Sequence, residues 1–265
     1  MKICFSTLGC PDWHFSEIIS TAADLGYDGI EIRGIGKDVF APDSPVFSGE
    51  RLAASKAMIE KNGLSVFCLD TTCVLSLENG YSEDKMRRTV WLAKKIGAKA
   101  VRVLGDAAPE PGDVDEALVL KRLKEATAIA AEYGVTVIIE TNGVYSDSKK
   151  LKSLIEAVGA DNLGALWDIQ HPYRVAGESM EETAKTLGGL IKHVHVKDSV
   201  VENGKTVYKM TGYGKLPIKE AVSALKSVGY EGALSLEWLK RWNRDLEEPG
   251  IVFAHYIRAM RAMVK

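Results

Sequence analysis

The sequence predicts an α/β protein folded as a closed (β/α)8 barrel, and three observations lead to this fold class. Eight short apolar runs alternate with helix-like stretches along the 265 residues. Several of these runs end in an acidic or imidazole side chain. Seven helix-like stretches end at a glycine, as helix C-termini often do: Gly26, Gly63, Gly97, Gly134, Gly159, Gly188 and Gly229. Eight alternating units imply a parallel sheet with right-handed crossovers, and a chain of this length closes into a barrel as one domain, residues 1–265.

The expected strands are short apolar runs bounded by turn residues, which is typical of buried strands in a parallel sheet. In chain order they read KICFST, GIEIR, LSVFCLD, AVRVLG, VTVIIE, LGALWD, IKHVHVKD and ALSLEW. An open, doubly wound sheet is the alternative architecture. It lacks support here, because no G-x-G-x-x-G motif follows the first strand.

The intervening helices can be read from capping residues and apolar spacing. Ser16 is expected to cap the helix EIISTAADL, which ends at Gly26. The longest helix is expected over residues 115–133, where apolar side chains recur at helical spacing before Gly134.

Two long connections, at about residues 33–48 and 198–216, leave the C-terminal ends of strands. In a barrel these ends surround the catalytic face, so both connections are candidate lids. Gly212 and Gly214, in the second connection, could offer backbone amides to an anion.

Charge and composition narrow the partners, the location and the assembly that we expect for this protein. The formal net charge is −2, which disfavours binding to nucleic acid or to an anionic membrane surface. The sequence shows neither a secretory leader nor an apolar stretch of membrane-spanning length, so we expect a cytoplasmic protein. The four cysteines show no C-x-x-C spacing. A homodimer is the expected assembly, because it is the commonest one.

Glu140, Asp168, His195 and Glu237 lie at or beside the ends of the fifth to eighth strands. In a closed barrel these ends converge, and buried charges there are costly unless they are paired or bind a cation. Three carboxylates and one imidazole suit one divalent ion in an octahedral shell. We expect Mn²⁺, with Mg²⁺, Co²⁺ or Zn²⁺ as alternatives.

The order Glu…Asp-x-x-His…His-x-His-x-Lys-Asp…Glu resembles the xylose-isomerase-like barrel superfamily, which includes the sugar phosphate isomerase/epimerase family. The opening FSTLGCPDWHFSEIISTAADLGYDGIEIRG, the WDIQH segment and HVHVKD match its pattern, so the resemblance spans essentially the whole chain. It implies that the metal ligands are Glu140, Asp168, His195 and Glu237. It also implies that His171 contacts the substrate.

The resemblance implies a metal-dependent isomerase or epimerase of a sugar, sugar phosphate or cyclitol. Glu140 and Glu237 would transfer the proton through a metal-stabilised enediolate. The alternative is an inosose-dehydratase-like lyase using the same metal site. Ketose 3-epimerases of this pattern usually carry a glutamate near Ser146 and an arginine near Val201; both are absent here, and Lys197 resembles the dehydratase branch.

Four further side chains are candidates for substrate binding. His171 and Lys197 follow the sixth and seventh strands, Glu31 lies at the exit of the second, and Trp13 follows the first and could form an apolar wall for a sugar ring. A nuclease of the endonuclease IV type is a rival function, but its three-metal cluster needs more histidines at strand exits. A non-catalytic sugar-binding protein is a second rival, since a fold alone does not establish catalysis.

Overall fold

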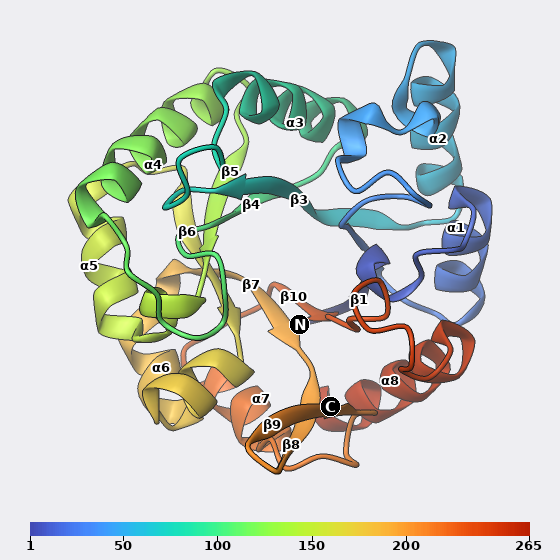
Figure 1. The fold of residues 1–265 in the computed structure, drawn as a ribbon. Coiled ribbons are helices and arrows are strands. Elements are labelled where there is room, and N and C mark those ends of the chain that lie inside the picture. The colour runs from blue at the N-terminus through green and yellow to red at the C-terminus, as the bar shows by residue number, and fades with distance from the viewer.

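In the computed structural model, which describes residues 1–265, eight parallel strands close into a barrel in the order β1-β10-β7-β6-β5-β4-β3-β2 (Figure 1). The predicted fold class and all eight predicted strands are confirmed. Their bounds are β1 (Lys2–Ser6), β2 (Gly29–Ile32), β3 (Ser65–Val74), β4 (Ala100–Leu104), β5 (Thr136–Glu140), β6 (Leu163–Asp168), β7 (Ile191–Val196) and β10 (Ala233–Leu236).

Helices surround the barrel on the outside (Figure 1). They are α1 (Phe15–Asp24), α2 (Glu50–Lys61), α3 (Glu83–Ile96), α4 (Glu116–Ala131), α5 (Ser148–Val158), α6 (Met180–Leu187), α7 (Ile218–Ser227) and α8 (Pro249–Val264). None of them has both the length and the apolar content needed to cross a bilayer.

Two helix starts show how local capping sets the boundaries. The α4 helix begins after Asp115, whose carboxylate accepts a hydrogen bond from the Leu118 amide at 3.0 Å, so the start predicted for the longest helix is confirmed. The α1 helix begins at Phe15 rather than after Ser16, so the predicted N-cap is wrong. The reason is Glu17, whose carboxylate accepts a hydrogen bond from the His14 amide at 2.6 Å and moves the cap two residues earlier.

The barrel interior is apolar in its lower layer and charged above it. Cys68, Ala100, Ile138 and Leu166 form a buried apolar cluster contributed by β3 to β6. Side chains two residues further along a strand point to the same side, so the next interior layer holds Asp70, Arg102, Glu140 and Asp168. Strand pairing places Asp168 beside His195 of β7. The alternation of side chains along the strands therefore places these acidic residues at the C-terminal mouth of the barrel.

The connection after β7 forms an antiparallel hairpin, β8 (Asp198–Glu202) and β9 (Lys205–Lys209), which projects beside α7 and α8 (Figure 1). The buried Asp198 carboxylate accepts hydrogen bonds from the amides of Gly212, Gly214 and Leu216 at 2.8, 2.9 and 3.2 Å. The two glycine amides therefore already bind an anion, which is the side chain of Asp198. These two amides are therefore not available to an external anion.

The two glycines provide a matched test of this anchor. A Cβ at position 214 would overlap the Asp198 carboxylate and the Ser199 amide nitrogen, whereas a Cβ at position 212 meets nothing, although φ is +88° there. We expect Gly212→Ala to lower the free energy of unfolding by about 1 kcal/mol through backbone strain alone. Gly214→Ala should cost about 2 kcal/mol or more, because it breaks charged hydrogen bonds. Urea unfolding followed by circular dichroism measures both values; equal losses would show that Asp198 does not anchor the loop.

Candidate metal centre and active site

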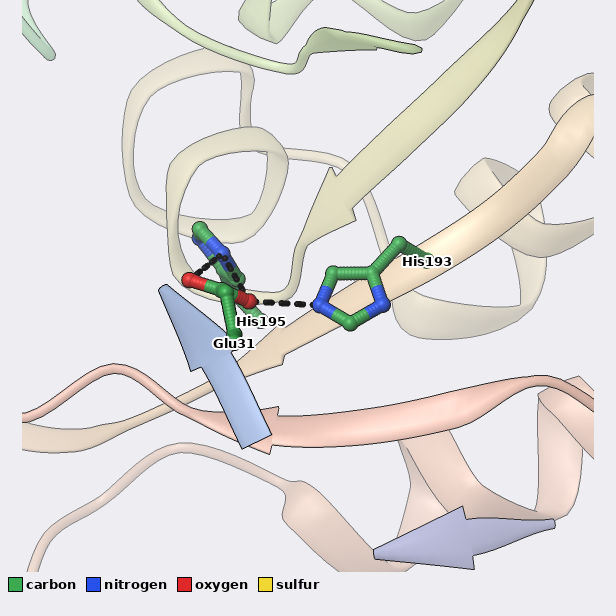
Figure 2. A group of neighbouring side chains, drawn as sticks. All are labelled: Glu31, His193 and His195. Carbon is green, nitrogen blue, oxygen red and sulfur yellow. Dashed lines mark hydrogen bonds and ion pairs between the residues drawn. The ribbon is translucent and has the colours of Figure 1, made fainter. Parts of the chain in front are cut away.

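The floor of the mouth is built by Glu31, His193 and His195, which Figure 2 shows as one connected group. The carboxylate of Glu31 lies between the two imidazoles, 2.5 Å from Nε2 of His193, and both its oxygens lie 3.1 Å from Nε2 of His195. Burial raises the pKa of Glu31, but the charges and hydrogen bonds of His195 and His193 outweigh it and hold that pKa well below its usual range. Glu31 therefore remains ionised and fixes the ring of His195.

With Nε2 bound to Glu31, the other ring nitrogen of His195 faces three carboxylates. Its Nδ1 lies 3.5 Å from Oε1 of Glu237, 3.9 Å from Oε1 of Glu140 and 3.9 Å from Oδ2 of Asp168, and it has no hydrogen-bond partner. Two atoms that each lie about 2.1 Å from one ion can be at most roughly 4.2 Å apart. Nδ1 of His195 is thus close enough to each of these carboxylates to share an ion with it. Ligand atoms of Glu140, His195 and Glu237 all lie within 4.8 Å of one another, and Asp168 forms a second such group with Glu140 and His171.

The electrostatics of this cluster favour a cation. Although burial opposes the charged imidazole, the carboxylates of Glu31 and Glu237 raise the pKa of His195 to about 10. Burial raises the pKa of Glu140 to about 7, against the opposing charges of Arg102 and His195. Glu237 is equally buried, but Lys197 and His195 lower its pKa to about 2. The cluster thus retains a proton where a metal ion would otherwise provide the positive charge.

Two internal cations partly neutralise the acidic residues. The ammonium of Lys197 lies 2.6 Å from Oδ2 of Asp168 and also contacts Glu237. The guanidinium of Arg102 lies 3.0 Å from Asp70 and 3.5 Å from Glu140. Lys197 therefore pairs with carboxylates of the proposed metal shell, and one oxygen of Glu140 and one of Glu237 are each held by a basic side chain.

His171 stands at the side of the same cluster. Its Nδ1 lies 2.8 Å from the carbonyl oxygen of Thr141, and its Nε2 lies 3.9 Å from Oδ1 of Asp168. Burial lowers the pKa of His171, so the ring is neutral at neutral pH. A neutral ring that donates from Nδ1 to a carbonyl keeps Nε2 as an acceptor. His171 can therefore accept a hydrogen bond from a hydroxyl group in the mouth.

A cavity of about 250 Å³ lies above these groups. Four of the residues predicted from the sequence line it: Glu140, His171, Lys197 and Glu237. Asp168 and His195 are fully buried beneath it.

Glu31 and Trp13 do not line the cavity. Glu31 is 0% exposed and lies behind His195, as its two histidine contacts require. Trp13 packs edge-on against Phe253, with 5.6 Å between the ring centroids. The structure thus places both residues away from the position expected for substrate contact.

Sequence reasoning did not place several residues that line the cavity: Leu8, Arg33, Asn142, Tyr208 and Leu239. It left open whether Arg102 contacts a ligand or only pairs with an acid, and whether Trp242 caps the mouth or packs in the core; both line the cavity. A signal existed for Arg33, because it lies two residues beyond Glu31 and side chains of a strand repeat every two residues. Tyr208 belongs to the hairpin, so no strand pattern placed it at the mouth.

The chain was compared with known proteins. Fructoselysine 3-epimerase of Shigella flexneri is 24% identical over 285 residues, covering 100% of this chain and 98% of that protein. A structure of D-psicose 3-epimerase with D-tagatose from Clostridium cellulolyticum H10 superposes with a TM-score of 0.79 at 17% identity, covering 100% of each chain. The IOLI protein with a bound zinc atom gives a TM-score of 0.78 at 18% identity, covering 100% of this chain and 98% of that one. The family described as xylose isomerase-like TIM barrel matches residues 19–261, and this chain belongs to that family.

Proposed function

We propose that the protein is a divalent-metal-dependent isomerase or epimerase acting on a sugar, sugar phosphate or cyclitol. One observation carries the proposal. An imidazole nitrogen without a partner, Nδ1 of His195, meets three buried carboxylates at 3.5 to 3.9 Å beneath a cavity of about 250 Å³. The names of the relatives support the reaction class, since two are 3-epimerases of sugar-derived compounds.

In this proposal Glu140, Asp168, His195 and Glu237 hold one ion. Carboxylate oxygens with one imidazole suit Mn²⁺, Mg²⁺ or Co²⁺, and the zinc atom named for the IOLI structure keeps Zn²⁺ among the ions to be tested. When bound, such an ion polarises a substrate carbonyl and its neighbouring hydroxyl and stabilises the negative charge of an enediolate. We expect Mn²⁺ to support activity best.

Glu140 and Glu237 are the proposed proton carriers. They belong to β5 and to the exit of β10, which β6 and β7 separate, so the two carboxylates reach the cavity from different directions. One carboxylate takes the proton from the carbon next to the substrate carbonyl, which leaves the electron pair in the enediolate. Proton return from the other carboxylate to the opposite face of that carbon inverts it, and return to the adjacent carbon gives isomerisation.

His171 and Lys197 are the proposed substrate contacts. The acceptor nitrogen of His171 suits a sugar hydroxyl, and it lies in the cavity wall together with the ammonium of Lys197. Lys197 already neutralises Asp168 and Glu237, so its charge also limits the repulsion between these carboxylates during proton transfer. Glu31 is assigned to positioning His195 and not to substrate contact.

The reaction is tested by hydrogen exchange at carbon. We expect Mn²⁺-loaded protein in deuterated water to incorporate deuterium beside the carbonyl of at least one ketose, sugar phosphate or inosose, as measured by NMR. Glu140→Gln and Glu237→Gln should each lower the exchange rate by roughly 100-fold or more, because the proton carrier is removed. Glu220→Gln, an exposed residue of α7, is the matched control and should exchange like the natural protein.

Metal content and thermal unfolding of each variant separate loss of proton transfer from loss of metal or fold. Full exchange in Glu140→Gln and Glu237→Gln with a responsive substrate would contradict the proposed roles. A dehydrated product, in place of a deuterated sugar or cyclitol, would show that the enzyme is a lyase.

Metal affinity tests the position of Glu31 independently of any substrate. A carboxylate that orients a metal-binding histidine is worth about 10- to 100-fold in affinity, so Glu31→Gln should weaken Mn²⁺ or Zn²⁺ binding by that factor. Titration against a chromophoric chelator measures it, with Glu220→Gln again as the control. Unchanged affinity in a folded Glu31→Gln protein would mean that His195 does not depend on Glu31 to bind the ion.

A further inference from the structure

Arg33 lines the mouth of the cavity without an acidic partner. It directly follows β2, and its Nη1 donates one hydrogen bond, to the carbonyl oxygen of Val39 at 3.1 Å. No carboxylate oxygen lies within 4.0 Å of its guanidinium. The other two cations of the cavity wall, Arg102 and Lys197, each have carboxylate partners. Arg33 is therefore the basic side chain of this cavity with donors left for a ligand.

Besides burial, charges of both signs act on Arg33 from beyond hydrogen-bond distance: Arg102 and Arg241 lower its pKa, whereas Asp70 and Glu237 raise it. Burial, followed by the charge of Arg102, lowers the pKa of Arg33 to about 10, so the group is still charged at neutral pH. Arg241 adds a second positive charge nearby, and its own Nε and Nη2 are buried without hydrogen-bond partners. A partly buried charge of this kind is costly unless an opposite charge approaches it. The rim of the mouth therefore attracts an anion.

Trp242 gives this part of the mouth an apolar wall. The Cζ atom of Arg33 lies 5.8 Å from the centroid of the Trp242 ring, and both residues line the cavity. Trp242 is 56% exposed, whereas Trp238, four residues earlier, is 1% exposed and belongs to the core. An aromatic face against a guanidinium restricts its motion and excludes water from one side of it. The pair thus forms a ready binding site for a charged end of a small molecule.

We propose that Arg33 binds an anionic group, a carboxylate or a phosphate, on the substrate whose carbon-bound proton Glu140 and Glu237 transfer. This inference rests on the proposed function and narrows its substrate class from sugars and cyclitols in general to acidic ones. Arg33 and Glu140 line the same cavity of about 250 Å³, which is below the roughly 300 to 1,000 Å³ of most ligand sites, so one small molecule can contact both. The bidentate geometry of arginine matches carboxylate and phosphate equally, so the two sources are compared directly.

Calorimetric titration of the Mn²⁺-loaded protein provides the test. The probes are D-fructose, D-fructose 6-phosphate and D-fructuronate, which are a neutral ketose, a phosphorylated one and a carboxylated one. We expect at least one anionic probe to bind about 10- to 100-fold more tightly than D-fructose, as charged hydrogen bonds provide. The preferred anionic probe identifies phosphate or carboxylate as the recognised group.

The variants show whether Arg33 causes this preference. Arg33→Met should reduce it to nearly one, and Arg33→Lys, which keeps the charge but loses the fork, should retain part of it. Arg51→Met removes the same charge from an exposed position of α2 and should leave the preference intact. Thermal unfolding confirms that each variant is folded, and Arg33→Lys decides the question if Arg33→Met is unstable.

Two results would overturn the inference: equal or absent binding of the anionic probes in the natural protein, or an unchanged preference in both Arg33 variants. These failures differ from a failure of the proposed function. Deuterium exchange of D-fructose without any preference for anions overturns only the role of Arg33. A preference for anions that depends on Arg33, without carbon-bound exchange in any compound, supports that role and overturns the isomerase.

Discussion

The mutual repulsion of buried carboxylates is the constraint that shapes the mouth of this barrel. Glu31, Glu140, Asp168 and Glu237 all lie within 4 Å of a ring nitrogen of His195, and each is at most 7% exposed. Carboxylates gathered around one buried ring repel one another in a medium of low dielectric constant. The barrel tolerates them because Lys197 bridges two of them, Arg102 contacts a third, and His195 itself retains a proton. The fold therefore requires positive charge at the mouth of the barrel to offset these carboxylates.

The side chains along β7 and at its exit contact these carboxylates at three different depths in the barrel. His193, His195 and Lys197 share one face of the strand because they are two residues apart. His193 lies lowest and contacts Glu31. His195 contacts Glu31 through Nε2 and faces the carboxylate cluster with Nδ1. Lys197 lies uppermost and forms ion pairs with Asp168 and Glu237. One strand thus fixes the orientation of the site, supplies its imidazole ligand and limits its negative charge.

The sequence was sufficient to predict the barrel, because glycine stops and short apolar runs are local signals that closure of the sheet does not alter. It was also sufficient to bring Glu140, Asp168, His195 and Glu237 together, since ends of parallel strands must converge. How deep each of these side chains lies in the barrel was harder to predict. Whether Glu31 faces the cavity or lies behind His195 depends on the stagger between β2 and β7, which no pattern within one strand records.

Features that depend on connections were not predicted for a related reason. Asp198 ends the seventh apolar run, directly after Lys197, and nothing in that run indicated a role for its side chain. In the structure its carboxylate accepts hydrogen bonds from the amides of Gly212 and Gly214 in the following loop. Tyr208 reaches the cavity from the hairpin, whose course is set by such contacts and not by periodicity.

The cavity is therefore negative at its floor and positive at its rim, and the two ends have different explanations. A floor of carboxylates is what a divalent cation requires. An unpaired guanidinium at the entrance works against that requirement, because it repels an entering cation and leaves Arg33 partly desolvated. Holding the ion thus gives no reason for Arg33 to be there. A ligand that carries negative charge at one end and oxygen donors for a metal at the other satisfies both ends of the cavity at once, and a neutral sugar satisfies only the floor.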